Sequence, residues 1–454
     1  MNQKTKTSKI EAVRTPRFYK QWMLAGNPSD FIDELIRRFG DFVHYRGLID
    51  FYLINDPELV RQVLKETHRT FDKDTVIYNR FRNALGNSLV NAEGKHWQKQ
   101  RRLIQPAFGP KTIKSFYDIM ANASETLANR WQTHAEDKQT FDVSREMNLL
   151  TLEIAGKSLF SDGFIDRASD IREWTQVINR YSAKPPLPII GHPDFPTPMN
   201  LKLKRVLQEY NTFIYEMIDR RIEGEAQSDL LSVFLSMEDD ETGEKMEISE
   251  IAEEVLGMII GGHETSSTAL TWIFYELNNH PQIEAELTQE LQQVTKGKPL
   301  RFEQVSELRY MKAIIEEAMR LHPPLWFENR NAKEDVELGG SIIPKGSMVA
   351  LSRYALHRNP RIWERPDEFD PTRFLTDDDD AAKKQKAAGN YIPFSSGPRV
   401  CIGRHFAMME LIVILSTILQ RYQVHVSPRN SLKVATNLTM ELRDGLLIEL
   451  TTRK

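Results

Sequence analysis

A long amphipathic segment in the middle of the chain constrains the fold more than any other feature. The segment begins at Ser249 with acidic residues in its first turns, where a helix dipole is positive, and Pro281 ends it after His280. At a rise of about 1.5 Å per residue, such a helix would be close to 50 Å long. This length predicts a large, mainly helical domain in which the segment serves as a central scaffold.

Composition narrows the class of protein. Hydrophobic residues make up 40% and charged residues 27% of the 454 residues, which is typical of a globular chain. The net charge of −4 provides no basic field, so nucleic acid is not an expected partner. Residues 1–30 scatter basic side chains among polar ones and lack the apolar run of roughly 20 residues that spans a membrane. We therefore expect an N-terminal segment without an anchor, no association with membranes and a cytoplasmic location.

Short strands accompany the helical pattern. Asp56-Pro57 supplies an N-cap and a first-turn proline, which predicts a helix through Leu64. No repeat and no Gly/Ser linker divides the chain, so residues 31–454 are expected to form one domain, mainly α with a small β-rich region. The expected strands are two within 41–54, one each at Val336–Leu338, Ile342–Ile343 and Met348–Leu351, and a hairpin over Leu438–Leu450.

The only cysteine of the chain lies in a distinctive loop. Residues 394–403 (FSSGPRVCIG) place Cys401 directly before an apolar helical run over 404–420. A single cysteine excludes an intramolecular disulfide and a multi-thiolate zinc site. A lone cysteine is usually a small buried hydrophobe. At a helix N-terminus, however, unpaired N–H groups and the helix dipole stabilise a thiolate, which is the form that binds iron.

This loop resembles the haem-binding loop of the cytochrome P450 family, whose pattern Phe-x-x-Gly-x-Arg-x-Cys-x-Gly it matches without departure. The resemblance implies the cytochrome P450 fold around a buried haem b, iron protoporphyrin IX, in a soluble protein of the bacterial type. It also implies that Cys401 is the axial ligand of the iron. In the same loop, Arg399 would contact a haem propionate, and Phe394 and Gly403 would lie against the cofactor.

A second resemblance concerns three charged residues. Glu317 and Arg320 stand at i and i+3, where side chains on one helix face can pair. Such pairs are common and weak on protein surfaces. Here, however, the pair precedes a segment containing Arg373, and both segments resemble the family's Glu-x-x-Arg helix and the arginine loop that joins it. The resemblance implies that the three residues form a buried structural network that governs haem retention.

The middle of the long segment contains residues that a helix interior rarely selects. Gly257, Gly261 and Thr265 fall on one helix face at i, i+4 and i+8, which predicts a slot without side chains, capped by a hydroxyl. Dioxygen bound to iron requires such a slot. The segment resembles the family's acid–alcohol motif, which implies that Glu264 and Thr265 handle the protons of oxygen activation.

Further residues are candidates for binding the cofactor. Trp97 and Arg101 lie one helical turn apart and can present an indole N–H and a guanidinium to one anion. The family resemblance identifies that anion as a haem propionate. Arg330, in the strand region that follows the Glu-x-x-Arg helix, matches another position that contacts a propionate.

Together these motifs predict a monooxygenase that inserts one atom of O2 into an apolar molecule, by hydroxylation or epoxidation. The chain contains no flavin or iron–sulfur motif, so its electrons are expected from a ferredoxin or flavodoxin with its reductase. A monomer is expected. Three alternatives remain: a peroxygenase that uses hydrogen peroxide, a haem-thiolate isomerase or dehydratase, and a haem sensor or carrier.

The sequence leaves the substrate open. The Pro-rich segment 184–200 and the Pro-Pro-Leu-Trp run at 323–326 resemble bacterial enzymes that act on terpenoids or fatty acyl chains. Arg80 or Arg82 is a candidate anchor for a fatty-acid carboxylate. The resemblance implies a largely apolar pocket, lined by Ile77, Tyr78, Phe81, Leu85, Met258, Gly261, Leu325, Trp326, Phe327 and residues 436–438, which include Leu438.

Overall fold

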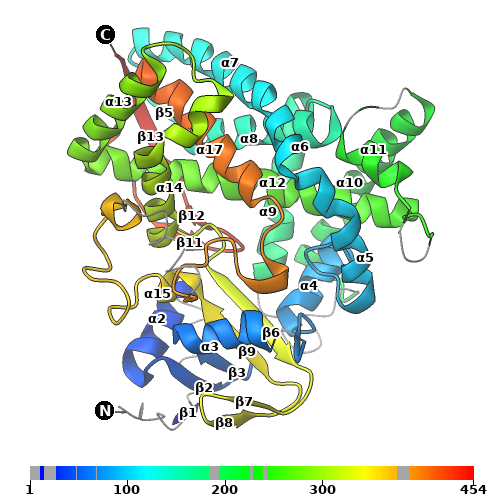
Figure 1. Ribbon diagram of the computed structural model, residues 1–454. Coiled ribbons are helices and arrows are strands. Elements are labelled where there is room, and N and C mark those ends of the chain that lie inside the picture. Colours follow the sequence, from blue (N-terminus) through cyan, green and yellow to red (C-terminus); the bar gives the residue numbers. More distant parts are fainter. Residues whose placement is uncertain are drawn as a thin grey trace.

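A long helix crosses the whole molecule (Figure 1). It is α12 (Ile248–Asn279), seen in a computed structural model. Glu247 and Glu250 form a capping box at its start, and Pro281 begins the next helix, α13 (Pro281–Thr295). The predicted central helix is therefore confirmed almost to the residue. The structure describes residues 11–14, 27–47, 49–67, 69–183, 194–224, 227, 229–238, 243–375 and 388–453.

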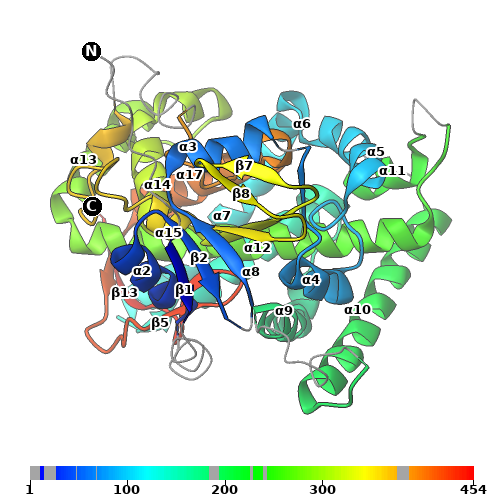
Figure 2. The same cartoon turned by 90° about the horizontal axis from the view of Figure 1, so that it is seen from below.

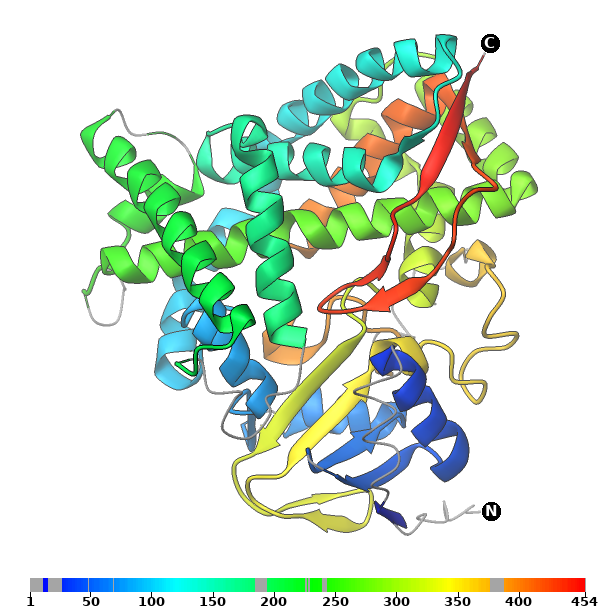
Figure 3. The same ribbon diagram turned by 180° about the vertical axis from the view of Figure 1, so that it is seen from behind.

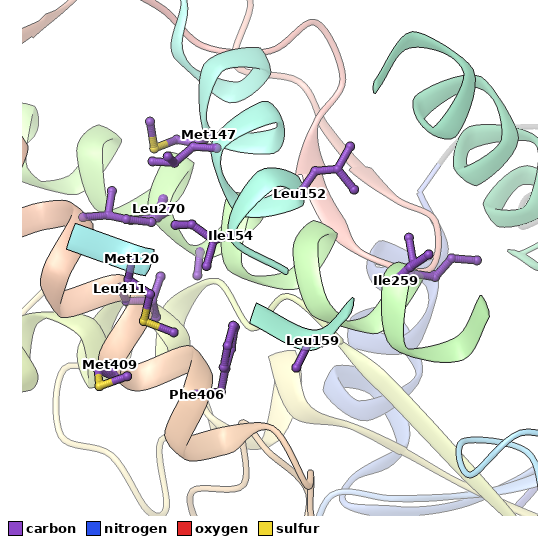
Figure 4. Close-up of a cluster of buried hydrophobic side chains, with 14 of the residues drawn as sticks. Met120, Met147, Leu152, Ile154, Leu159, Ile259, Leu270, Phe406, Met409 and Leu411 are labelled. Carbon is purple, nitrogen blue, oxygen red and sulfur yellow. The ribbon is translucent and has the colours of Figure 1, made fainter. Parts of the chain in front are cut away.

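The main core surrounds α12. Helices α7 (Tyr117–Glu136), α8 (Val143–Phe160) and α17 (Arg404–Arg421) pack there through aliphatic and aromatic side chains. Burying this apolar surface is the principal stabilising contribution to the fold. The side chains labelled in Figure 4 are Met120, Met147, Leu152, Ile154, Leu159, Ile259, Leu270, Phe406, Met409 and Leu411.

Other helices surround this core, and several begin with proline at the first helical position, where its missing N–H costs nothing. The predicted helix at Pro57 forms, but it changes to a π-helical turn at Gln62. Of the Pro-rich segment, residues 184–193 lie outside the described residues, and a helix begins at Pro198. The bounds are α2 Pro28–Phe39, α3 Pro57–Arg61, α4 Val76–Leu85, α5 Gly94–Ile104, α6 Pro110–Ser115, α9 Ala168–Ala183, α10 Pro198–Glu223, α11 Leu230–Ser236, α14 Arg309–Leu321 and α15 Arg353–Leu356.

A six-stranded sheet lies at one end of the molecule, and Figure 2 shows it in front of α12. The two strands expected within 41–54 are confirmed as an antiparallel pair, β2 and β3. The later short strands are confirmed as well, as β7, β8 and β9. The sheet order is β1 (Glu11–Arg14), β2 (Phe42–Arg46), β3 (Phe51–Ile54), β9 (Met348–Ser352), β6 (Phe327–Ala332) and β4 (Phe71–Asp72), and β7 (Val336–Leu338) pairs separately with β8 (Ser341–Ile343).

The predicted hairpin over Leu438–Leu450 is wrong. Its two arms pair with different strands, although Gly445 makes the expected turn with a φ of 73°. The Leu446 N–H donates to the Asp142 carboxylate (3.1 Å), which draws the second arm away from the first. The pairs are β11 (Val434–Thr436) with β12 (Met440–Leu442), and β13 (Leu447–Thr452) with both β10 (Tyr422–Val426) and β5 (Phe141–Asp142).

None of the described helices is both long enough and apolar enough to cross a membrane. Glutamate side chains at 254, 264 and 276 interrupt the apolar surface of α12, the longest of these helices.

Candidate functional site

The loop that contains Cys401 is held by its own backbone and by a neighbouring helix. The Cys401 N–H donates to the Phe394 carbonyl (2.9 Å), which closes the loop. Gly397 has a φ of 71°, and a Cβ there would lie 2.0 Å from the Leu64 carbonyl oxygen. Glycine is therefore required at 397. At Gly403, the nearest atom to an added Cβ is 4.0 Å away on Phe108, so the described residues impose no such requirement there.

Cys401 is exposed, although neighbouring protein groups influence its thiol. Surrounding protein raises the pKa of the Cys401 thiol, while the Gly403 N–H and the nearby Arg101 lower it. The residue nevertheless retains accessible surface. The N–H group at the start of α17 therefore opposes the effect of burial on this thiol, in the direction that was expected of a helix N-terminus.

The middle of α12 also has an uncovered position. Gly261 is exposed within this otherwise largely buried helix, and a Cβ built on it would meet no atom within 4 Å. The Thr265 hydroxyl donates to the Gly261 carbonyl (3.0 Å). At Gly257, by contrast, a Cβ would lie 2.9 Å from the Ser88 hydroxyl. The predicted slot therefore comprises Gly261 and Thr265, and Gly257 serves a packing contact instead.

Glu264 is directed toward a different helix from its neighbour Thr265. The amide nitrogen of Asn179, on α9, lies 2.7 and 2.6 Å from the two carboxylate oxygens of Glu264. Burial raises the pKa of Glu264 to about 7, and the Asn179 side chain opposes this shift. A substantial fraction of this carboxyl is therefore protonated at neutral pH. The structure places the acid and the alcohol next to each other in sequence but gives them separate partners.

A cluster of cations lies near the Cys401 loop. Arg330 forms a buried ion pair with Glu328, and Arg399 pairs with Glu93 (2.7 Å). Lys73 is buried beside them, donating to the Val90 carbonyl (2.6 Å). Desolvation, followed by repulsion from Arg330 and Arg399, depresses the pKa of Lys73 well below its usual value. An anion placed among these three cations would relieve that repulsion.

The sequence did not identify Lys73 as part of this cluster. It follows strand β4 in a short polar run, and neither its burial nor its proximity to Arg330 is apparent from sequence spacing. Tyr78 also lies beside this cluster, because burial raises its pKa and the nearby Arg330 opposes that rise. Its expected role as pocket lining stays a prediction.

Trp97 and Arg101 have different partners in the structure. The Arg399 guanidinium stacks on the Trp97 ring, 3.9 Å from its centroid. Arg101 donates to the Val400 carbonyl (3.1 Å). Burial lowers the pKa of Arg101, Cys401 opposes this shift and Arg404 adds to it. Trp97 thus supports the cation cluster, while Arg101 fixes the cysteine loop to α5.

Glu317, Arg320 and Arg373 form one buried network. The Arg320 guanidinium donates to both Glu317 oxygens (2.6 and 2.8 Å), and Arg373 Nε lies 3.3 Å from Glu317 Oε1. Arg320 also donates to the carbonyls of His357, Pro366 and Glu368. Both Glu317 and Arg320 are 0% exposed. The network therefore ties α14 to the segment that leads toward the cysteine loop.

The candidate pocket residues come from elements that contact α12 or one another. Helix α12 contacts α4, and the Trp272 indole N–H donates to the Met440 carbonyl of β12 (2.8 Å). Trp326 is buried, and its N–H donates to the Asn437 carbonyl (3.0 Å), so its role is partly structural. Leu85 and Thr436 are also buried. The half-buried candidates are Ile77, Phe81, Met258, Leu325, Phe327 and Leu438.

Arg80 and Arg82, the candidate anchors for a fatty-acid carboxylate, are both hydrogen bonded to backbone carbonyls. Arg80 donates to the Tyr181 carbonyl through two nitrogens (3.1 and 2.8 Å) and stacks on the Tyr181 ring. Arg82 donates to the carbonyls of Asn91 and Lys73 (both 3.2 Å). Both guanidinium groups therefore join α4 to neighbouring backbone.

Known proteins share both this sequence and this fold. The family model described as Cytochrome P450 matches residues 14–448. Cyclooctat-9-en-7-ol 5-monooxygenase of Streptomyces melanosporofaciens is 34% identical over 87% of this chain and 84% of its own length. Pentalenene oxygenase of Streptomyces avermitilis is 31% identical, over 95% and 94%. The crystal structure of the cytochrome P450DA heme domain aligns with a TM-score of 0.86 and 27% identity, covering 98% of this chain and 97% of that chain.

The fold and the family match define a haem-dependent oxidoreductase. The chain belongs to the cytochrome P450 family and is a P450 monooxygenase. The mainly helical P450 fold expected from the sequence is confirmed.

The described residues fit the family's haem. Cys401 provides a thiol on an exposed residue, Gly261 leaves space beside α12, and the basic side chains of Lys73, Arg330 and Arg399 suit the two carboxylates of a porphyrin. When bound, the haem supplies the iron at which dioxygen is activated.

Proposed function

We propose that this P450 hydroxylates or epoxidises a cyclic terpenoid hydrocarbon or alcohol. The observation that carries the proposal is the engagement of Arg80 and Arg82 with backbone carbonyls, next to half-buried apolar side chains of α4 and α12. A neutral, apolar substrate suits such surroundings better than a fatty-acid carboxylate, which loses its hydration on burial. The names of the Streptomyces relatives, among them cyclooctatin synthase at 32% identity, support a terpenoid.

The residues have separate roles in this proposal. Haem b would be held by Cys401 as ligand of the iron and by Arg330, Arg399 and Lys73 as partners of its propionates. Trp97 stiffens Arg399, and Arg101 fixes the loop that contains Cys401. Phe394 closes that loop by accepting from the Cys401 N–H, and Gly403 begins the helix behind it.

Glu264 and Thr265 manage protons. The Thr265 hydroxyl, which now donates to the Gly261 carbonyl, can release that bond and donate into the open position beside Gly261. Glu264, protonated in part at neutral pH, is the reservoir that resupplies it. The peroxygenase and isomerase alternatives require no such acid–alcohol pair.

A binding titration tests the substrate class. We expect cyclic di- and sesquiterpenes to shift the haem absorption spectrum of the purified holoenzyme at lower concentration than fatty acids of equal carbon number. The physical reason is that a carboxylate would be buried without a dedicated cation. Methyl esters of the same acids serve as a control for chain length. Tighter binding of the free acids than of their esters would overturn the terpenoid proposal in favour of a carboxylate anchor.

Replacing Thr265 with alanine should separate oxygen consumption from product formation. We expect Thr265→Ala to keep the haem spectrum but to release most reducing equivalents as hydrogen peroxide, because the donor beside Gly261 is lost. The measurement is the ratio of product to NADPH oxidised, with a ferredoxin and its reductase supplying electrons. A fall in this ratio of about 100-fold matches the lower end of the usual contribution of a positioned proton donor. Thr271→Ser on the same helix is the matched control, and full coupling in Thr265→Ala would count against the role.

We extend the proposal to the protein's partners and location. Electrons come from a separate ferredoxin or flavodoxin with its reductase, and the protein acts as a cytoplasmic monomer. In the assay just described, omission of the ferredoxin should abolish turnover, whereas a peroxygenase would turn over with hydrogen peroxide alone.

A further inference from the structure

Within the described part of the chain, Asn179 is the residue of α9 whose side chain is hydrogen bonded to Glu264, the acid of the acid–alcohol pair. Figure 3 shows α9 crossing α12, with the red turn between β11 and β12 closer to the lower end of α9. Asn179 is 6% exposed, and the two residues that precede it, Val177 and Ile178, are core residues. Burying an amide among such residues costs free energy unless the amide is hydrogen bonded.

The two ends of the Asn179 amide differ in their partners. Its nitrogen contacts both oxygens of Glu264, whereas its buried oxygen, Oδ1, accepts no hydrogen bond in the described part of the chain. An amide can donate to a carboxylate and can also accept from a carboxylic acid. The unused Oδ1 is therefore the acceptor that a protonated Glu264 would need after a small rotation of either side chain.

We propose that Asn179 is a positioning residue that holds the Glu264 carboxyl on the α9 side of the site in both of its protonation states, by donating to the carboxylate and accepting from the acid. This inference rests on the proposed role of Glu264 as a proton reservoir. It makes α9 a partner in proton supply.

Other charged groups near Glu264 are few and unequal in effect. Glu441 of β12 repels the charged form of Glu264. Burial raises the pKa of Glu441 itself, and Arg172 and Arg180, which are exposed on α9, oppose that rise. On α12, His263 is buried, and burial lowers its pKa to about 4, so it is neutral near pH 7. Among these described neighbours, Asn179 is the one that is hydrogen bonded to the Glu264 carboxyl, so its removal should have the largest effect.

The position of α9 is fixed close to Asn179. The Arg80 guanidinium donates to the Tyr181 carbonyl, two residues further along the helix. Helices α4, α9 and α12 are therefore joined through polar contacts within one turn of α9. A displacement of this turn would withdraw the amide from Glu264.

Infrared difference spectroscopy of the holoenzyme tests the proposal. The carbonyl stretch of a protonated, buried carboxyl is titrated with pH, and Glu264→Gln identifies the band by removing it. Asn179→Leu keeps the side-chain size but removes the donor and the acceptor. The hydrogen bond that Asn179 donates to the carboxylate is stronger than the one that it accepts from the neutral acid, so the loss of both should raise the titration midpoint of Glu264 by about one pH unit. Asn179→Asp, which retains only acceptors and adds a like charge, should raise the midpoint further.

Gln176→Leu is the matched control, since it removes an exposed amide from the same helix and should leave the midpoint unchanged. Asn179→Ala repeats the test if the leucine variant does not fold. An unchanged or lower midpoint in both Asn179→Leu and Asn179→Ala would overturn the inference. A different result would contradict the proposed role of Glu264 as a proton reservoir: the same ratio of product to NADPH oxidised in Glu264→Gln as in the parent enzyme.

Discussion

The Cys401→Ala variant should accumulate as a folded chain that forms no product. The iron loses its only proposed protein ligand, so the thiolate signature in the carbon monoxide difference spectrum of the reduced protein disappears. Loss of a residue that merely orients a ligand costs roughly 10–100-fold in metal affinity or activity, and loss of the ligand itself should exceed that range. Haem content per chain and product formation are the two measurements.

The folding of this variant can be checked independently of its haem. The Cys401 side chain is exposed and lies outside the core clusters, so its truncation should leave no cavity in them. We therefore expect far-ultraviolet circular dichroism and the unfolding midpoint of the apoprotein to match those of apo parent protein. Cys401→Ser tests whether a hydroxyl of similar size suffices, and Ser396→Ala is the control within the same loop. Parent-like spectra and turnover in Cys401→Ser would overturn the ligand assignment.

Features encoded by adjacent residues could be predicted from the sequence. The cysteine loop and the capped start of α12 depend on neighbours within a few positions, and the strands of 41–54 depend on local alternation of side chains. The slot was predicted only in part, because Gly257 and Gly261 share one helix face but meet different surroundings. Ser88 occupies the space beside Gly257, whereas the space beside Gly261 is open.

Features that depend on tertiary contacts could not be predicted. Lys73 and Asn179 are polar residues whose burial is decided by chain segments far away in sequence. The hairpin prediction was wrong for the same reason, because Asp142 competes for the second arm with a hydrogen bond that spans the chain. The pattern of charges in the sequence likewise gave no indication that the Arg80 guanidinium would donate to the Tyr181 carbonyl.

Glu317→Gln should lower the free energy of unfolding by about 3–5 kcal/mol, since it leaves two guanidinium groups with no balancing charge in a buried site. Desolvation raises the pKa of Glu317 even though Arg320 and Arg373 oppose the rise. Burying this network is thus costly in itself, and each member offsets the burial of the others. The cost of removing one member therefore greatly exceeds the net contribution of the whole network.

The structure supplies a matched control for this prediction. Glu34 on α2 also pairs with an arginine three residues along the helix, Arg37, but that arginine side chain is 71% exposed. Glu34→Gln should change stability by no more than about 1 kcal/mol, as exposed pairs do. Chemical denaturation of both variants, with haem absorbance followed alongside circular dichroism, provides the comparison.

Haem release should precede global unfolding in Glu317→Gln, because the network holds the segment that leads to the cysteine loop. Arg320 donates to the His357 carbonyl, and the His357 ring accepts from the Ile392 N–H (2.9 Å), two residues before Phe394. Weakening the Glu317–Arg320 pair should therefore loosen the loop through His357. If Glu317→Gln and Glu34→Gln released haem at the same denaturant concentration, the network would have no special part in haem retention.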